Sequence, residues 1–90
     1  MYLWDESKSQ SNKKKHGISF DEARNSIFEG KNILAPGVAY DKEELRHAVI
    51  GKHNDKYYVG IFTITSQGLR IISVRRARHE EQEQAKAKGL

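Results

Sequence analysis

The stretch that decides the fold runs from Leu69 to Arg78 and reads Leu-Arg-Ile-Ile-Ser-Val-Arg-Arg-Ala-Arg. Its β-branched residues favour a strand, because they suit a pleated, half-buried surface. Strand alternation gives this stretch two faces. One face carries Arg70, Ile72, Val74 and Arg76, and the other carries Leu69, Ile71, Ser73 and Arg75. Because the pair at 71–72 is apolar on both faces, the pattern also predicts that the strand is interior to its sheet.

The end of this strand is strongly cationic. Arg75, Arg76 and Arg78 follow one another, and the next acidic residue is Glu80. The planar fork of a guanidinium group matches phosphate in a bidentate way, so the cluster is a candidate anion-binding site. The alternative is a solvated strand end whose arginines pair with Glu80 and Glu81.

The size of the chain predicts one domain over residues 1–90 with a thin core, since small domains bury only about 60% of their unfolded surface. The residues expected in that core are Trp4, Phe20, Ile27, Phe28, Ile50, Val59, Phe62 and Ile72. The sequence has no Cys, which excludes disulfides and thiolate metal sites. No apolar run is long enough for a membrane span or a signal peptide. We therefore expect a soluble, cytoplasmic protein with no membrane partner.

The charge of the chain is moderate but unevenly distributed. Sixteen Lys and Arg residues against 12 Asp and Glu give a formal net charge of +4. Lysines gather in Lys8–Lys15, and arginines gather in Arg70–Arg78. Two basic clusters on a small domain favour a polyanion or an acidic protein as partner. Solubility alone is the competing explanation.

The N-terminal half predicts an edge strand at Met1–Trp4 and two helices. The first helix ends at His16 before Gly17, and both Asp5 and a Ser7–Gln10 capping box are candidates for its start. It has no apolar residue between Ser7 and His16, so we expect it to be mostly solvated unless a ligand or partner covers it. The second helix, about Phe20 to Glu29, starts from a capping box at Ser19 and Glu22 and has one apolar face.

The C-terminal half predicts strands joined by short turns. A short strand at Asn32–Ala35 precedes a Pro36-Gly37 turn, and Asn54-Asp55 joins a strand at Arg46–His53 to one at Lys56–Thr65. With the strand from Leu69 they form an antiparallel meander. A helix over residues 78–88 follows, which either leans loosely on the domain or docks on a partner. The fold class is therefore α+β, with the meander packed against the N-terminal helices and its other face partly open.

The sequence contains no phosphate-binding loop, no zinc-ligand spacing and no Gly-x-Ser-x-Gly nucleophile motif. The four histidines, His16, His47, His53 and His79, are too scattered to predict a metal site. We therefore expect no metal and no cofactor. What remains is general acid–base and cationic chemistry on a phosphodiester.

A set of short motifs along nearly the whole chain resembles one family. These are Trp4-Asp5, Lys8, Asn12, Lys15-His16-Gly17, Ser19-Phe20, Glu22-Ala23, Arg46 with Ile50-Gly51, and Arg70-Ile-Ile-Ser-Val-Arg-Arg-Ala77 with Glu81. The pattern is similar to that of BrnT, the toxins of type II toxin–antitoxin pairs. The resemblance implies a RelE-like ribonuclease domain, RNA cleavage that inhibits translation and growth, and a hetero-oligomer with a BrnA-type antitoxin.

The same sequence departs from the family pattern at three positions. Glu6 stands where Pro is usual, Leu45 where Glu is frequent and Ala85 where Tyr is common. The last difference leaves the role of the C-terminal helix open.

The family chemistry suggests roles for the basic residues. Metal-independent RNA cleavage needs a base for the 2′-hydroxyl, cations for the phosphorane and an acid for the leaving oxygen. Arg46, Arg70, Arg75 and Arg76 are the candidate cations, and His16 is the candidate for proton transfer, with Glu81 or Lys15 as substitutes. Lys13, Lys14, Lys15 and Arg78 are candidate RNA-binding residues. Strand alternation favours Arg76 over Arg75, because it places Arg76 on the face of Arg70. The alternative function is a non-catalytic basic module that binds nucleic acid or an acidic protein.

Overall fold

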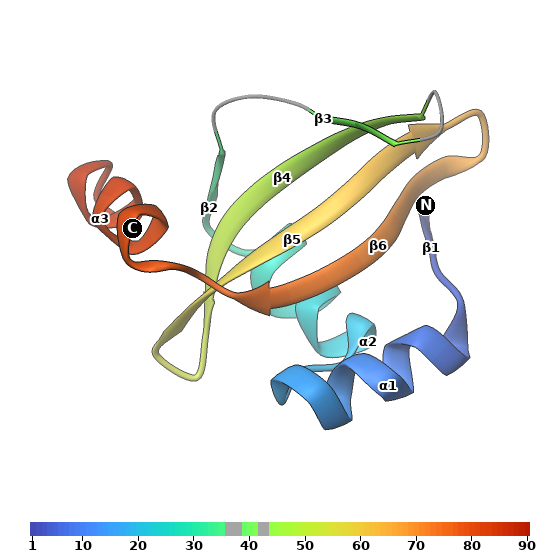
Figure 1. Ribbon diagram of the computed structural model, residues 1–90, viewed down its shortest axis with the longest axis horizontal. Helices are drawn as coiled ribbons and strands as arrows, with labels where there is room; N and C mark the ends of the chain where they lie inside the picture. Colours follow the sequence, from blue (N-terminus) through green and yellow to red (C-terminus); the bar gives the residue numbers. More distant parts are fainter. Residues whose placement is uncertain (36–38, 42–43) are drawn as a thin grey trace.

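Long antiparallel strands form the centre of the fold, as the meander prediction requires (Figure 1). They are β4 (Glu44–His53), β5 (Lys56–Thr65) and β6 (Gly68–Arg76). In the β4–β5 turn Asn54 and Asp55 have φ angles of 51° and 63°. Both angles are left-handed, which is the geometry that a two-residue hairpin turn needs and that Asn and Asp tolerate. The predicted turn is confirmed.

Shorter strands extend this meander on both sides. β1 (Tyr2–Leu3) pairs in parallel with β6, and β2 (Asn32–Leu34) pairs antiparallel with β4, so the order is β1-β6-β5-β4-β2. β3 (Ala39–Asp41) pairs with the first residues of β4. The computed structural model describes residues 1–35, 39–41 and 44–90, so the Pro36-Gly37 turn lies outside the described residues. Within those ranges no helix has the length and apolar character needed to cross a membrane.

Each face of the sheet carries its own hydrophobic cluster. The helix-facing cluster consists of Ile18, Phe20, Ala23, Ile27, Val49, Tyr58, Phe62, Ile71 and Val74. The opposite cluster consists of Ile50, Tyr57, Val59, Ala77 and Ala85. Of the predicted core residues, Phe20, Ile27, Ile50, Val59 and Phe62 are confirmed as buried. Trp4 and Phe28 are only half-buried at the edge of the first cluster.

The second predicted helix is confirmed in position but not in regularity. Ser19 Oγ accepts from the Glu22 amide at 3.1 Å, and Glu22 Oε1 accepts from the Ser19 amide at 2.9 Å, which completes the capping box. α2 (Phe20–Ala23) then continues as a π-helical segment, η1 (Arg24–Phe28). A Cβ atom at Gly51 would lie 2.9 Å from Cγ2 of Ile27, so glycine on β4 allows η1 to approach the sheet closely.

The first predicted helix, α1 (Glu6–His16), ends at Gly17 with φ 81°, as expected. Its N-cap is Asp5, whose carboxylate accepts from the amides of Ser7 and Lys8, so the Ser7–Gln10 capping box is wrong. The helix begins at Glu6, which places Asp5 and not Ser7 at the capping position.

The expectation of a mostly solvated α1 is confirmed, and the exceptions are Ser9 and Asn12, which are buried. Ser9 Oγ accepts from the Phe20 amide at 2.9 Å. The Asn12 amide group donates to the Ile18 carbonyl at 2.8 Å, and its oxygen accepts from the Val74 amide at 3.2 Å. These polar contacts hold α1 against the outer edge of β6, beyond the two residues, Leu69 and Arg70, that pair with β1. The predicted interior strand is therefore interior only at its start.

A β-bulge in β6 overturns the predicted faces of this strand. Ile61 pairs with Ser73 whereas Phe62 pairs with Ile71, so Ile72 is an extra residue with no register partner. After the bulge the alternation is reversed. Ile71 and Val74 are buried on the helix side, and Ile72 is only half-buried, contrary to its predicted place in the core.

The bulge also redistributes the arginines of β6. Arg70 pairs with Thr63 and Arg75 pairs with Val59, so these two arginines share the sheet face away from α2. Arg76 pairs with Tyr58 and lies on the helix-facing side. The predicted pairing of Arg70 with Arg76 on one face is therefore wrong.

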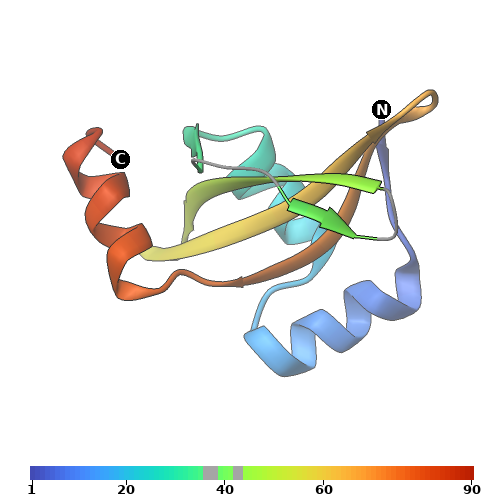
Figure 2. The same ribbon diagram turned by 45° about the horizontal axis from the view of Figure 1, so that its top comes forward.

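The C-terminal helix α3 (His79–Ala87) covers one end of the second face and lies at the opposite end of the molecule from α1 (Figure 2). Ala85 is fully buried there, and Tyr57 Oη donates to the Leu90 carbonyl at 2.7 Å. The helix is thus docked on the sheet rather than loosely attached.

Candidate functional site

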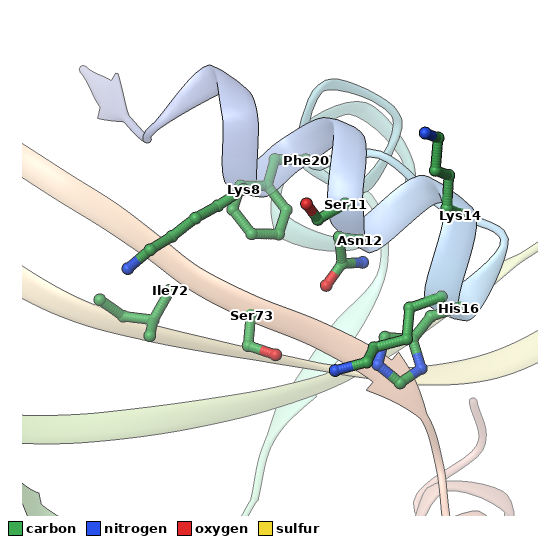
Figure 3. Close-up of a pocket in the computed structure, with 9 residues that line it drawn as sticks. Lys8, Ser11, Asn12, Lys14, His16, Phe20, Ile72 and Ser73 are labelled. Atoms are coloured by element: carbon green, nitrogen blue, oxygen red, sulfur yellow. The ribbon is translucent and has the colours of Figure 1, made fainter.

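An open groove of about 660 Å³ runs between α1 and β6. Figure 3 shows the side chains that line it, with those of α1 above the strand that carries Ile72 and Ser73. We call this the lysine groove, and its lining residues are Lys8, Ser11, Asn12, Lys14, Lys15, His16, Phe20, Ile72 and Ser73. The groove exists because α1 is held at the strand edge by Asn12, while the cations of its exposed side remain in solvent.

A second cavity of about 350 Å³ adjoins the first at the beginning of α1. We call it the arginine pocket, and its lining residues are Asp5, Lys8, Glu44, Arg46, Arg70, Ile71 and Ile72. Lys8 and Ile72 line both cavities. The two cavities are therefore neighbours along the outer side of β6, and the bulged residue lies between them.

The charges in the arginine pocket meet at one carboxylate. Glu44 Oε1 pairs with Arg70 Nη2, and Glu44 Oε2 lies 3.7 Å from Arg46 Nη2. The Glu44 and Arg46 side chains are 30% and 29% exposed, so the pair is partly shielded from water but reachable from the cavity. The structure thus brings together two predicted cations, Arg46 and Arg70, from β4 and β6.

Sequence reasoning missed Glu44 and did not assign Lys8 to the site. Glu44 stands two residues before Arg46, and this spacing places both on one face of a strand. That spacing was a usable signal once Arg46 was singled out. The contact with Arg70, 26 residues away, was not visible in the sequence.

A separate cluster lies at the far end of β6, beside α3. Arg75 donates two hydrogen bonds to the Glu81 carboxylate, at 2.8 and 2.9 Å, and Glu81 also accepts from the Arg78 amide at 2.7 Å. The hydrogen bonds from Arg75 lower the pKa of Glu81, and those same bonds raise the pKa of Arg75. At neutral pH the pair is therefore an ionised salt bridge that connects β6 to the start of α3. This is the pairing with Glu81 that the solvated-strand-end alternative described.

Arg76 lies on the opposite face of β6 from the Arg75–Glu81 salt bridge. Its guanidinium group is 5.5 Å from the centroid of the Tyr58 ring, and the residue is exposed. A Cβ atom at Gly17 would lie 4.0 Å from the same tyrosine's hydroxyl. Arg76 is therefore near the end of α1 that carries His16, and not near Arg70.

The predicted site residues consequently do not converge on one point. Eight residues separate Lys8 from His16 on α1, or ~12 Å along the helix axis at about 1.5 Å per residue. Because Ile72 is an extra residue in the bulge, Arg70 and Arg75 are four register steps apart on β6, or roughly 13 Å at about 3.3 Å per step. The predicted residues therefore form three separate groups, which are Arg46 with Arg70, His16 with Lys14 and Lys15, and Arg75 with Glu81.

Lys13 lies outside both cavities. Its ammonium group pairs with Glu22 at 2.8 Å, which links α1 to α2. Hydrogen bonding to Lys13 is the largest cause of the low pKa of Glu22, about 2.

Arg78 is exposed at the N-cap of α3. Among the described residues, no group of three or more His, Cys, Asp or Glu side chains is arranged to hold a metal ion.

Comparison with known families gives one match that covers most of the chain. Residues 4–81 match the family model described as the ribonuclease toxin, BrnT, of type II toxin-antitoxin system. The matched range includes α1, both cavities and Glu81, and it ends within the first turn of α3. A comparison with curated proteins finds no match.

Proposed function

This chain belongs to the BrnT family of ribonuclease toxins of type II toxin–antitoxin systems, and from that membership we propose that it cleaves RNA without a metal ion and so inhibits translation and growth. Membership implies RNA as target and an antitoxin protein as partner. We further propose a single RelE-like domain over residues 1–90, action in the cytoplasm, and a hetero-oligomer with an antitoxin of the BrnA type.

The observation that carries this proposal is the junction of the two cationic cavities along β6. An RNA strand laid along them meets Arg46 and Arg70 at one end and Lys14, Lys15 and His16 at the other. Both ends present donors suited to phosphate, and fixed cations stabilise the charge that develops on a phosphorane. The roles of these residues are the family expectation transferred to this geometry.

The remaining candidate residues lie outside the two cavities, and we propose supporting roles for them. Arg76 lies beside the His16 end, where it extends the cationic surface past Tyr58. Arg75 and Glu81 are bound to each other, so we assign them the positioning of α3 rather than direct contact with RNA. Lys13 stabilises the packing of α1 on α2, and Arg78 is an exposed outer contact for RNA.

The test is an RNA-cleavage assay with the purified full chain in the presence of a chelator. Wild type is expected to cut RNA, and Arg46→Ala combined with Arg70→Ala is expected to reduce the rate by roughly 10²-fold or more, because both phosphate cations are removed. Lys86→Ala on the exposed side of α3 is the matched cation control and should cut normally. A requirement for divalent metal would contradict the proposed chemistry. RNA binding without cleavage would favour the non-catalytic basic module.

The partner is tested in cells. Expression of the chain alone should arrest growth with degraded RNA, and co-expression of the antitoxin should restore growth. The antitoxin segment that covers the cationic groove should be acidic or amphipathic, because it must neutralise these arginines and lysines. An active chain that never copurifies with the antitoxin would contradict this part of the proposal.

A further inference from the structure

Glu44 is an unusual residue to find in a pocket that binds phosphate. A carboxylate at this place competes with RNA for Arg46 and Arg70 and repels the backbone of the substrate. A pocket built only for binding would be stronger without it. The side chain lines the cavity and is 30% exposed, so a bound nucleotide can reach it.

We propose that Glu44 is the general base of RNA cleavage, that Arg46 and Arg70 hold the reacting phosphate, and that Lys8 donates the proton to the leaving oxygen. This inference rests on the proposed ribonuclease function and specifies its chemistry. It places the reaction in the arginine pocket and makes the lysine groove a binding site for the adjoining part of the strand.

The proton and bond changes balance without a metal or cofactor. Glu44 takes the proton of the 2′-hydroxyl, and O2′ attacks the neighbouring phosphorus while the two guanidinium groups neutralise the phosphorane. The bond from phosphorus to O5′ breaks, and O5′ takes a proton from the Lys8 ammonium group. The products are a 2′,3′-cyclic phosphate and a 5′-hydroxyl, and water returns the proton from Glu44 to Lys8.

Distance separates Glu44 from the other candidate bases. A base and an acid must both come within about 3 Å of one reacting nucleotide. Glu81 is paired with Arg75, which lies roughly 13 Å along β6 from Arg70. Figure 3 shows Lys8 and His16 at opposite ends of the lysine groove, consistent with ~12 Å along α1. Lys8 alone among the cations of α1 lines the same cavity as Glu44.

The charged groups around Glu44 come from each neighbouring element. Arg46 belongs to its own strand, Arg70 comes from β6, and Asp5 and Lys8 come from the start of α1. General-base catalysis requires an ionised base, so the proposal predicts that cleavage slows toward acid pH.

The deciding variant is Glu44→Gln, which keeps the shape of the side chain and removes its basic oxygen. We expect the single-turnover cleavage rate to fall by about 10²–10⁴-fold. Binding of an RNA whose cleavage-site ribose lacks the 2′-hydroxyl should stay equal or become tighter, because a negative charge is removed. The acid side of the pH–rate profile should disappear. Glu83→Gln on α3, whose side chain is 56% exposed, is the matched control and should behave as wild type.

Two companion variants keep the result decisive if Glu44→Gln unfolds, which a thermal melt would show. Glu44→Asp retains a carboxylate that is one methylene shorter, so it should keep the acid side of the profile at a reduced rate. Lys8→Arg should bind RNA normally but cut slowly, because a guanidinium group does not release its proton.

Several outcomes would overturn the assignment. Full or increased cleavage by Glu44→Gln would show that the carboxylate only competes with RNA. Parallel loss of binding and cleavage, with the acid side of the pH profile intact, would show that Glu44 only orients the arginines. Products with a 3′-hydroxyl would exclude attack by O2′. A wild-type chain that cuts nothing would instead refute the proposed ribonuclease function itself.

Discussion

The two helical segments on the same side of the sheet are attached in opposite ways. α2 and η1 bury Phe20, Ala23 and Ile27 against the strands. α1 buries no apolar side chain and is held through Ser9 and Asn12. Apolar attachment stabilises more but consumes a helix face, whereas two hydrogen-bonding side chains fix a helix and leave the rest of its surface for charge. The difference shows how a 90-residue chain keeps both a core and a cationic groove.

The largest effect on stability is expected at Ile27 of η1, which is fully buried and packs against Gly51 of β4. Ile27→Ala should lower the free energy of unfolding by about 2–5 kcal/mol, because it removes buried methyl groups and leaves a cavity. Urea denaturation measures the change. Ile64→Ala is the control, since Ile64 is 62% exposed and its truncation should cost less than about 0.5 kcal/mol. Equal effects of the two variants would show that η1 is not the anchored segment.

An intermediate effect is expected at Asn12. Asn12→Ala leaves the Val74 amide and the Ile18 carbonyl without their partner, at a cost of about 1–3 kcal/mol. RNA affinity should fall as well, since α1 then loses its fixed position beside β6. Ser11→Ala, one position away, removes no such bond and serves as the stability control. A cost above that of Ile27→Ala would reverse the ranking of the two attachments.

A smaller, pH-dependent effect is expected at Glu22, which joins the two segments through Lys13. Its pKa is lowered from 4.5 to about 2. The carboxylate therefore stabilises the fold fully above pH 4.5, and this stabilisation disappears as the pH falls from 4.5 to about 2. Because Glu22 is 37% exposed, solvent screening limits the contribution to under about 1 kcal/mol.

Glu22→Gln should accordingly be less stable than wild type at pH 6 and indistinguishable from it below pH ~2, where the carboxylate is protonated. Urea denaturation across this range tests the sign. A difference between the two proteins that stays constant down to the lowest pH would show that the capping hydrogen bonds, and not the charge, carry the effect.

The smallest effect on stability is expected on the solvent side of α1. Lys14→Ala combined with Lys15→Ala should change the free energy of unfolding by less than about 0.5 kcal/mol, since both side chains are exposed. The salt dependence of RNA binding should nevertheless weaken, by a slope of ~0.7 for each phosphate that the protein no longer neutralises. Lys86→Ala with Lys88→Ala at the end of α3 gives the same net charge and should leave that slope unchanged. An unchanged slope in both double variants would place the RNA elsewhere.

Local signals in the sequence were sufficient for most elements of the fold, although β3 was not predicted. The capping box at Ser19, the end of α1 at Gly17 and the Asn54-Asp55 turn each depend on neighbours within a few residues, and all are confirmed. The meander followed from these turns. The BrnT resemblance, stated from short motifs, agrees with the family match over residues 4–81.

Interactions between distant residues limited the prediction of the site. Asn12 is buried because it meets the Val74 amide 62 residues later, and no helical pattern encodes that hydrogen bond. The bulge in β6 depends on the register with β5, so alternation alone placed Arg76 with Arg70. Glu44 gains its significance from Arg70 across the sheet. These errors concern contacts between residues that lie far apart in the sequence.

The bulge at Ile72 has a consequence for how this strand tolerates changes in length. Deleting a residue from a regular strand turns one part of the strand over and exchanges its inward and outward side chains. Because residues 71 and 72 are both isoleucine, deleting either one gives the same chain. That deletion would restore regular pairing and keep Arg70 and Arg75 on one side and Val74 on the other. The bulge is thus a place where β6 can lose one residue while the order of inward and outward side chains survives.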